Sequence, residues 1–490
     1  MSDVIVIGAG VAGCAVAREL ARYDLDVLVL EAGYDVACGA SRTNSGIVHG
    51  GYDPIPGTLK ARYNVAGARM MPGLAAEIGF RYQNNGSMVV AFDDAQMDAV
   101  CELERRAQAN GVRGVRVVTG DRALELEPNL NPGVVGALVC DESGICDPFG
   151  LTVALAENAA ANGVEFRFGT RVAHVSRASR EGGWVVSLAG GGSIGARAVV
   201  NAAGAHAIEI HNQVSAHRLE SRPRLGEYEL MSRDMGPTFS RTMFQAPGPK
   251  GKGVLVSPTV EGNLIVGPDA VDVADPDDTA TTPEGLAWVV EQARRTWPGY
   301  AGREVITNFA GVRPSGAAGD FVIGEPDDAS GFFDVAAFDS PGLTSAPAVA
   351  VDVARDVAAE LGAGPNRSFE PHRDQPPRFI EMDEAERAAA VAADPLFGHI
   401  VCRCEQVSEA EILAAIHAPI PATSVTGVKR RCRAGTGRCQ GGFCAPLVAE
   451  IISRETGMPI EDVLLAGPGS ELAPYQRGEA HDVDLSLIHI

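Results

Sequence analysis

Five of the ten cysteines lie close together near the C-terminal end of the chain, in a pattern that suits metal binding. One residue separates Cys402 from Cys404, and four residues separate Cys439 from Cys444. Four thiolates from two such pairs suit either a zinc ion or an iron–sulfur cluster. We expect no secretion signal, because the first apolar run spans only residues 4–7. In such a chain, clustered cysteines favour a metal or cluster site over disulfides.

Basic residues surround these cysteines, although the chain as a whole has a formal net charge of −22. A [2Fe–2S] centre with four thiolates carries about −2 when oxidised and becomes more negative on reduction. Nearby cations and the N–H groups of the turn GTGRCQGG would favour the reduced form. The charge pattern therefore favours a redox cluster, and a zinc-stabilised small domain is the alternative from the residues alone. The cations are Lys429, Arg430, Arg431, Arg433 and Arg438.

A glycine motif near the N-terminal end predicts a dinucleotide site. Gly8 permits a tight turn, Gly10 lets the backbone approach a pyrophosphate, and Gly13 allows a helix to pack closely on a strand. The helix N-terminus then offers free N–H groups to the anion. Glu31 ends the next strand, where its carboxylate would bind a ribose 2′-OH and repel a 2′-phosphate, which argues against NADP. A glycine turn that binds nothing is the alternative, and the glycines alone do not separate FAD from NAD.

Later segments separate the two cofactors by resemblance. GASRTNSGIVHGG at 39–51 resembles the loop that flanks the flavin in the glycine oxidase and glycerol-3-phosphate dehydrogenase group of FAD enzymes. VVNAAGAHA at 199–207 is similar to the second cofactor strand of that family. FAGVRP at 309–314 and SPGLTSAPAVA at 340–350 are similar to the segments that close over the isoalloxazine. The resemblance extends over residues 3–360, with ESGICDPFGLT at 142–152 similar to the segment that crosses between domains.

This resemblance implies FAD as the cofactor and assigns particular residues to it. Small hydroxyl and amide side chains of the first loop would bond the pyrophosphate and the ring edge, and later backbone positions would close over the ring. Together with Gly8, Gly10, Gly13 and Glu31, the cofactor residues expected are Ser41, Thr43, Asn44, Ser45, Ala203, Gly204, Gly311, Gly342, Leu343 and Thr344.

Enzymes of this group pass a hydride from a C–H bond next to a hydroxyl or amine to the flavin. They need a base for the hydroxyl proton and a cation for an anionic substrate. We predict Arg313 as the cation, because a guanidinium can hold a carboxylate or phosphate with two bonds, and a structural arginine paired with a carboxylate is the alternative. His49 is the candidate base, with a histidine that merely packs near the ring as the alternative. Lys60, Arg62 and Lys252 are weaker anion-binding candidates.

The C-terminal segment resembles the bacterioferritin-associated-ferredoxin-like (BFD-like) [2Fe–2S] domain, which also ends the large subunit of anaerobic glycerol-3-phosphate dehydrogenases. The CxC motif and the CQGxxC motif carry this resemblance. It implies that Cys402, Cys404, Cys439 and Cys444 bind the cluster. Cys432 departs from the family pattern, which has a non-ligand such as Thr at that position.

The rest of the sequence must position these sites. The pattern predicts a strand at 4–7, a helix at about 12–22 and a strand at 27–30, which together form a βαβ unit. Further helices are expected at 149–163 and at 346–361, with Gly362 as the C-cap. In the C-terminal part, a capping box precedes a helix and another helix follows the last ligand. The residues concerned are Ser408, Glu411, Cys444 and Arg454.

We therefore predict an α/β protein of two redox parts. A Rossmann-like FAD-binding domain is interleaved with an antiparallel-sheet substrate domain, and a small helical [2Fe–2S] domain follows. The expected bounds are 1–370 for the oxidoreductase region, 371–397 for a linker with one short helix, 398–458 for the cluster domain and 459–490 for a tail.

By this resemblance the chain oxidises a small anion, with sn-glycerol 3-phosphate first, and passes electrons through the cluster to a flavoprotein or iron–sulfur subunit. L-2-hydroxyglutarate, another 2-hydroxy acid or an amino acid is the second hypothesis. A non-catalytic electron-transfer subunit is the third. The net charge of −22 disfavours nucleic acid and anionic membranes as direct partners. We expect a cytoplasmic protein, held at the inner membrane, if at all, through a partner.

Overall fold

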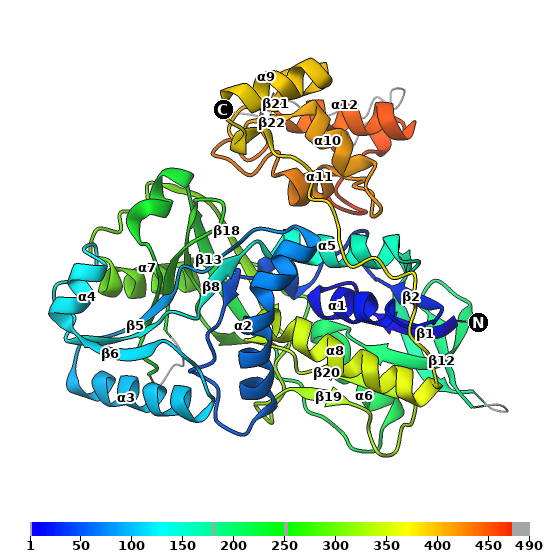
Figure 1. Ribbon diagram of the computed structural model, residues 1–490, viewed down its shortest axis with the longest axis horizontal. Helices are drawn as coiled ribbons and strands as arrows, with labels where there is room; N and C mark the ends of the chain where they lie inside the picture. Colours follow the sequence, from blue (N-terminus) through cyan, green and yellow to red (C-terminus); the bar gives the residue numbers. More distant parts are fainter. Residues whose placement is uncertain (1, 179–181, 249–252, 473–490) are drawn as a thin grey trace, which may run out of the picture. The chain divides into compact units, whose positions relative to one another are not determined.

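The computed structural model divides the chain into two compact units (Figure 1). The first unit is Met1–Gln375 and the second is Pro376–Ile490. The division falls inside the stretch 371–397 that the sequence predicts as a linker. The residues that the structure describes are 2–178, 182–248 and 253–472.

The first unit contains a largely parallel sheet that carries the glycine motif. Its central strand β1 (Ser2–Ile7) lies between β12 (Ser193–Asn201) and β2 (Val27–Leu30), and both pairings are parallel. Each of these strands is buried at its apolar positions, as expected for a sheet covered on both faces. The other strands of the sheet are β9 (Glu165–Arg167), β10 (Val172–Arg177), β11 (Trp184–Leu188), β19 (Val322–Gly324) and β20 (Phe332–Ala336).

Four long helices pack together beside this sheet (Figure 1). Helix α1 (Val11–Leu20) packs against α5 (Pro148–Ala161) and α8 (Gly342–Leu361), and α2 (Leu59–Ile78) also packs against α8. The predicted helices are confirmed. Helix α8 begins four residues earlier than expected, and Pro347 lies inside its first turns. Its C-cap Gly362 has a left-handed φ of +65°, as the sequence predicts. The short helix α6 (Ala207–Val214) packs on β10 and β20.

A second, mostly antiparallel sheet forms the substrate part of the unit, so the predicted fold class is confirmed. Only its pairing of β5 with β14 is parallel. Helices α3 (Asp94–Ala109), α4 (Gly120–Leu126) and α7 (Pro283–Thr296) pack on it. The strands are β17 (Val271–Asp272), β13 (Arg224–Met231), β16 (Leu264–Gly267), β15 (Leu255–Pro258), β14 (Thr242–Gln245), β5 (Ser87–Ala91), β7 (Gly136–Cys140) and β6 (Val115–Thr119), with β18 (Val305–Arg313) beside β13.

A small third sheet connects the two parts of the first unit. In it, β8 (Gly144–Cys146) pairs with both β3 (Ile47–Val48) and β4 (Tyr82–Gln83). All residues of β3 and β8 are buried. Because β3 directly precedes His49, this sheet fixes the backbone that presents the candidate base.

The second unit is small and helical, with its own apolar core. The capping box between Ser408 and Glu411 at the start of α10 is confirmed. Val463 is fully buried in the core, so the described chain after residue 458 packs into this unit, whereas 473–490 lie outside the described residues. Its elements are α9 (Glu384–Ala393), β21 (Ile400–Cys402), β22 (Val407–Ser408), α10 (Glu409–Ile416), α11 (Val425–Cys432) and α12 (Ala445–Thr456). Among the described residues, no helix is both long and apolar enough to cross a bilayer.

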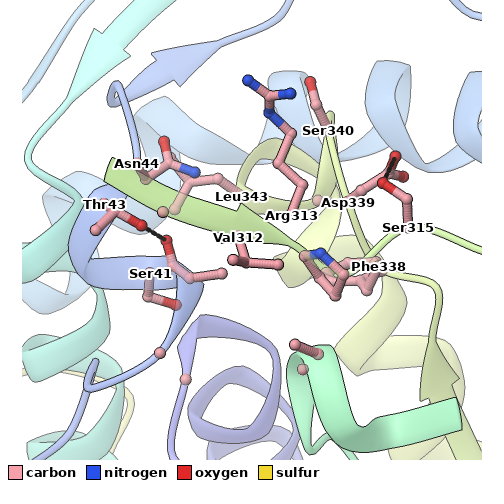
Figure 2. A pocket seen from close by; sticks show the side chains of 18 of the residues that line it. Ser41, Thr43, Asn44, Val312, Arg313, Ser315, Phe338, Asp339, Ser340 and Leu343 are labelled. Carbon is pink, nitrogen blue, oxygen red and sulfur yellow. Dashed lines mark hydrogen bonds between the residues drawn. The ribbon is translucent and has the colours of Figure 1, made fainter. Parts of the chain in front are cut away.

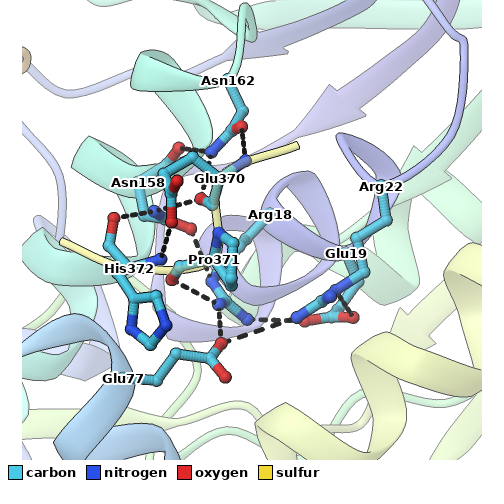
Figure 3. A network of polar contacts seen from close by, with 9 residues as sticks. All are labelled: Arg18, Glu19, Arg22, Glu77, Asn158, Asn162, Glu370, Pro371 and His372. Atoms are coloured by element: carbon cyan, nitrogen blue, oxygen red, sulfur yellow. Dashed lines mark hydrogen bonds and ion pairs between the residues drawn. The ribbon is translucent and has the colours of Figure 1, made fainter. Parts of the chain in front are cut away.

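A polar network holds the end of the first unit in place (Figure 3). Arg18 of α1 is only 2% exposed, and its guanidinium donates to Asn158 Oδ1 at 2.8 Å and to the carbonyl oxygen of Pro371 at 3.2 Å. The same guanidinium forms an ion pair with Glu77 of α2. A few residues later, Arg373 pairs with the buried Glu157 at 2.6 Å. One buried cation thus connects three helices to the segment that leads out of the unit.

We expect the Arg18→Met substitution to lower the free energy of unfolding of the first unit by about 2–4 kcal/mol, because it leaves Glu77, Asn158 and the Pro371 carbonyl without a buried donor. Urea unfolding monitored by circular dichroism measures this change. Arg122→Met is the matched control, because Arg122 is 56% exposed and pairs only with a surface carboxylate. A loss at Arg18 no larger than the loss at Arg122 would show that the network is dispensable.

Candidate active site and cluster site

A cavity of about 820 Å³ in the first unit brings most of the predicted cofactor residues together (Figure 2). This volume is in the range of cofactor pockets. Residues of both large sheets line it, together with the loop 39–45 and the start of α8. The lining includes Gly8, Gly10, Glu31, Ser41, Thr43, Asn44, Ser45, Ala203, Gly204, Gly311, Gly342 and Leu343, and both predicted catalytic residues, His49 and Arg313.

The glycine turn between β1 and α1 forms one wall of the cavity. Gly8 has a φ of +102°, and a Cβ atom there would lie 2.5 Å from the carbonyl oxygen of Ala202. Gly10 is the N-cap of α1, and a Cβ atom there would lie 3.3 Å from Ser41 Oγ. Ser41 Oγ accepts a hydrogen bond from the N–H of Val11 at 3.0 Å. Because Gly8 and Gly10 carry no side chains, the backbone of this helix start lies open to the cavity beside the Ser41 hydroxyl, which suits an anionic pyrophosphate.

Glu31 at the end of β2 lies on the same wall. Its carboxylate accepts hydrogen bonds from the N–H groups of Ala9 and Gly33, each at 2.6 Å. Burial raises the pKa of Glu31, while these two hydrogen bonds and the charge of Arg171 act in the opposite direction. The carboxylate is thus fixed in the position where a ribose hydroxyl is expected.

Gly13 and Thr344, also among the predicted cofactor residues, do not appear in the cavity lining, so their part in binding the cofactor stays a prediction. A Cβ atom at Gly13 would lie 1.9 Å from the carbonyl oxygen of Gly8, so this glycine serves helix–strand packing. The Thr344 hydroxyl is fully buried, accepts from the His49 N–H at 3.0 Å and donates to the Ile47 carbonyl oxygen at 3.3 Å. Gly13 packs against the Gly8 turn, and Thr344 holds the backbone of His49.

The loop 39–45 is held against β18 by very close packing. A Cβ atom at Gly311 would lie 1.8 Å from Thr43 Oγ1, so only glycine allows this contact. Asn44 Oδ1 accepts from the N–H of Gly46 at 2.8 Å, which shapes the end of the loop. The packing brings the loop next to Arg313, the last residue of β18. The close packing of Thr43 on Gly311 therefore fixes the loop 39–45 and β18 relative to each other at the cavity wall.

Arg313 differs from other cations that line the cavity. Its Nη2 donates to the neutral carbonyl oxygen of Asp269 at 2.9 Å. By contrast, Lys60 pairs with the Asp339 carboxylate at 2.6 Å, and Arg224 pairs with the Asp272 carboxylate at 3.0 Å. Arg313 also interacts with the Asp269 carboxylate, whose pKa its charge lowers while burial raises it. Figure 2 shows its side chain extending from β18 in the same direction as that of Ser340.

The imidazole of His49 is positioned by contacts on several sides. Its Nε2 lies 3.3 Å from Ser340 Oγ, and its ring stacks on Phe244 with centroids 5.9 Å apart. The backbone of His49 is held by Thr344 and by the side-chain amide of Asn64. His49 and Arg313 both reach the same cavity, which is the arrangement that a base and an anion-binding cation require.

Tyr228 also belongs to this end of the cavity, and the sequence pattern gave no signal for it. It lies on β13, stacks on Phe309 with centroids 5.1 Å apart, and lines the cavity. Burial raises the pKa of its phenol, and hydrogen bonds to Arg313 and Ser45 act in the opposite direction. The phenol thus connects the predicted cation with the predicted cofactor loop.

The weaker anion-binding candidates are placed differently from one another. Lys60 lines the cavity in its pair with Asp339, whose other oxygen accepts from Ser315 Oγ at 2.9 Å. Arg62 is 62% exposed and pairs with Asp352 on the surface, so it does not reach the cavity. Lys252 lies outside the described residues.

The four predicted ligand cysteines of the second unit converge on one site. Cys404 Sγ lies 3.7 Å from Cys439 Sγ, and the thiols of Cys402 and Cys444 hydrogen bond to each other. The glycines of the neighbouring turn allow this: a Cβ atom at Gly437 would lie 2.3 Å from Cys404 Cβ. The sulfur atoms therefore face a turn whose backbone can approach them closely.

Backbone N–H groups point at these sulfur atoms. The pKa of Cys402 is lowered to about 6, first by its hydrogen bond with Cys444 and then by the N–H groups of Gly435 and Glu405. The N–H groups of Phe443 and Gly441 lower the pKa of Cys439. Four sulfur donors surrounded by N–H groups fit a thiolate-bound iron–sulfur cluster, in which such hydrogen bonds set the reduction potential.

The basic residues near the cysteines are partly structural. Arg433 pairs with the buried Glu405 at 2.9 Å, and Arg431 donates to the carbonyl oxygens of Gly427 and Ile420. Burial lowers the pKa of Lys429. The predicted role of these cations in favouring the reduced cluster therefore stays a prediction, and several of them also hold α11 in place.

Cys432 has contacts that suit a non-ligand thiol. Its Sγ donates to the carbonyl oxygen of Val428 at 3.3 Å within α11. Burial raises the pKa of this thiol to about 12. A buried, protonated thiol that is bonded within its own helix suits the core rather than metal binding.

Comparison with known proteins gives two family matches. Residues 3–355 match the model for FAD dependent oxidoreductases, and residues 400–454 match the BFD-like [2Fe-2S] binding domain. The "Glycerol 3-phosphate dehydrogenase" of Caloramator mitchellensis is 42% identical over 466 residues, which is 94% of this chain and 96% of that protein. The mitochondrial "L-2-hydroxyglutarate dehydrogenase" of Arabidopsis thaliana is 28% identical, over 72% of this chain and 82% of that protein.

A solved structure is also similar to the first unit. The dithionite-reduced L-alpha-glycerophosphate oxidase from Mycoplasma pneumoniae with FAD bound has a TM-score of 0.72 and 29% identity. The match covers 76% of this chain and 99% of that one. The likeness therefore accounts for nearly the whole of the oxidase, while about a quarter of this chain has no counterpart in it.

We expect Gly10→Val to weaken FAD binding at least tenfold, because a branched side chain at this helix start would occupy the space in front of the N–H groups. The ratio of flavin to protein absorbance and a titration of the apoprotein with FAD measure the effect. Gly73→Ala is the matched control, since a Cβ atom at this exposed position of α2 meets nothing within 4 Å. Equal flavin content in the two variants would disprove the assigned role of the turn.

We expect Cys439→Ser to remove iron and visible cluster absorption, whereas Cys432→Ser keeps both, because Cys439 faces the other ligand sulfurs and Cys432 bonds within its helix. Iron and zinc analysis with spectra of the reduced protein measures this. Iron loss in Cys432→Ser alone would reverse the ligand assignment. Zinc in a colourless second unit would exclude the cluster.

Proposed function

We propose that this chain, which belongs to the FAD dependent oxidoreductase family, oxidises sn-glycerol 3-phosphate to dihydroxyacetone phosphate. The chain is an FAD-dependent oxidoreductase that also carries a [2Fe–2S] domain. The observation that carries the substrate proposal is its 42% identity, over 94% of its length, to a protein named glycerol 3-phosphate dehydrogenase. The geometry of the cavity supports it.

The substrate's phosphate needs a cation that is not already neutralised. The chain has a net charge of −22, so its long-range field repels an anion and the attraction must be local. Arg313 is the candidate, because it lines the cavity and donates its direct hydrogen bond to a carbonyl oxygen, while the Asp269 carboxylate interacts with its charge. A guanidinium can hold two phosphate oxygens at once and so orient the substrate. Tyr228, bonded to Arg313, would keep the guanidinium in place.

The hydroxyl proton needs an acceptor at the same end of the cavity. We assign this role to His49, whose Nε2 lines the cavity beside Ser340 Oγ. The stacked ring of Phe244 and the bonds to the backbone of His49 restrict the imidazole to one position. FAD, when bound, supplies the hydride acceptor. The residues of the chain bind the phosphate, take up the proton and exclude water.

The second unit supports a dehydrogenase that passes electrons to a protein rather than to oxygen. The similar glycerophosphate oxidase is covered over 99% of its length by only 76% of this chain. The relative named dehydrogenase, by contrast, is matched over 94% of this chain, which includes much of the cluster-binding unit. The second unit is thus matched in the relative named dehydrogenase, a name that implies an acceptor other than oxygen, and is not matched in the oxidase. A flavoprotein or iron–sulfur protein would receive the electrons.

L-2-hydroxyglutarate is the second candidate substrate, favoured by the 28% identical relative from Arabidopsis. Both substrates are small anions with a secondary hydroxyl, so Arg313 and His49 could serve either. The distinction lies in whether the cavity prefers a phosphate or a carboxylate.

We expect glycerol 3-phosphate to bleach the flavin bands under anaerobic conditions, and Arg313→Met to lower kcat/KM with an artificial acceptor about 100-fold, because roughly 3 kcal/mol of charge-assisted binding is lost. Arg62→Met is the matched control, since Arg62 forms a surface ion pair outside the cavity. We expect this variant to retain the wild-type kcat/KM.

Three results would count against this proposal. Bleaching by L-2-hydroxyglutarate and not by glycerol 3-phosphate would change the substrate. A chain that no small substrate reduces, but that a reduced partner protein does, would be an electron-transfer subunit. Equal losses in Arg313→Met and Arg62→Met would remove Arg313 from the substrate site.

A further inference from the structure

The four predicted ligand cysteines are not equally accessible. Cys402 and Cys444 are 1% and 2% exposed, whereas Cys404 is exposed and Cys439 is partly exposed. A cluster held by these four sulfurs is therefore shielded by the core on one side and reaches solvent on the side of Cys404 and Cys439. Electron transfer falls off steeply with distance, so a partner would approach from this side.

The residues between and after the ligands form a surface that combines apolar and basic side chains. Phe443, directly before Cys444, is 83% exposed, and Leu447 in the first turn of α12 is 40% exposed. Arg403 and Arg438, each next to a ligand cysteine, are also exposed. We call these four residues the cluster face. Aromatic residues and arginines are the types that contribute most to protein–protein binding.

The charge of this segment differs from that of the rest of the chain. Residues 400–454 contain seven Lys and Arg against four Asp and Glu, while the whole chain has a net charge of −22. Of these cations, Arg403 and Arg438 are exposed beside the ligands, so their local charge attracts partners of opposite charge at short range, and the acidic remainder of the chain disfavours binding elsewhere. Charge complementarity therefore selects an acidic partner.

We propose that the cluster face docks an acidic electron-carrier protein, with Phe443 as the apolar anchor and Arg403 and Arg438 as the charged contacts. The inference rests on the proposed function, in which electrons leave through the cluster. In each encounter the reduced cluster loses one electron and returns to its oxidised form, and the partner's redox centre gains that electron. Two encounters remove the two electrons that one substrate molecule delivers.

The test uses the full-length protein with FAD and iron, reduced by dithionite so that it does not depend on the substrate. The probes are an acidic soluble haem protein of the cytochrome b class and the basic cytochrome c, both ferric. We expect the acidic haem protein to bind more tightly than cytochrome c. We expect its Kd to rise roughly tenfold or more when added salt screens the charges. Binding is measured by titration with the oxidised proteins, and electron transfer by stopped-flow absorbance of the haem.

The variants are Phe443→Ala and Arg438→Glu, with Ile460→Ala and Arg62→Glu as matched controls. Ile460 is 46% exposed and Arg62 is 62% exposed, and neither borders a ligand cysteine. We expect the two cluster-face variants to raise the Kd for the acidic probe about tenfold and to slow haem reduction, with unchanged iron content. Arg438→Glu should also improve binding of the basic probe.

Several outcomes would overturn the proposal. Unchanged binding of both probes in both variants would show that the cluster face is not used. Slower reduction of the cluster by glycerol 3-phosphate, with unchanged probe binding, would show that the cluster face takes part in electron transfer within the chain and not in docking a partner. A change in sedimentation of the protein alone would assign the face to a second copy. Failure of glycerol 3-phosphate to bleach the flavin would refute the proposed function but leave the dithionite experiment decisive for docking.

Discussion

Backbone N–H groups pointing at a negative group at close range are the interaction on which both redox sites depend. In the first unit, Gly8 and Gly10, which have no side chains, bring the start of α1 against the cavity beside the Ser41 hydroxyl. In the second unit, the N–H groups of Gly435 and Gly441 point at ligand sulfurs. Dipoles fixed in this way need no reorganisation when charge arrives. They occur only where the chain turns closely enough, which explains the glycines at both places.

Side-chain cations cannot replace these dipoles, because in this acidic chain many of them are already neutralised. Lys60 and Arg224 pair with carboxylates at the cavity wall, and Arg433 pairs with a buried glutamate beside the cysteines. Such pairs stabilise the local structure and contribute little field to a ligand. Uncompensated positive charge is therefore confined to a few positions. This restriction makes Arg313 informative: its direct bonds go to a carbonyl oxygen and a phenol, and the Asp269 carboxylate interacts with its charge.

The sequence predicted what short motifs encode. The βαβ unit, the helix caps at Ser408 and Gly362 and the convergence of the four cysteines all depend on residues close together in the chain or on a family motif. What it missed depends on contacts between distant segments. Tyr228 reaches Arg313 only because β13 and β18 pair. Gly13 and Thr344 belong to the same motifs but pack behind the lining segments, because a motif does not state which of its residues will border a cavity.

The arrangement of the cysteines also bears on how the two sites can cooperate. A hydride brings two electrons together, whereas an iron–sulfur cluster carries one at a time. A flavin accepts a pair and can release single electrons, so in the proposed order of electron flow it would come after the substrate and before the cluster. The burial of Cys402 and Cys444 against the exposure of Cys404 gives the second unit a shielded side and an open side. An enzyme that reduced oxygen at the flavin would need neither the cluster nor this asymmetry, because small O2 needs only access to the cavity. The unequal burial of the ligands is therefore the feature that most directly argues for a protein as the final electron acceptor.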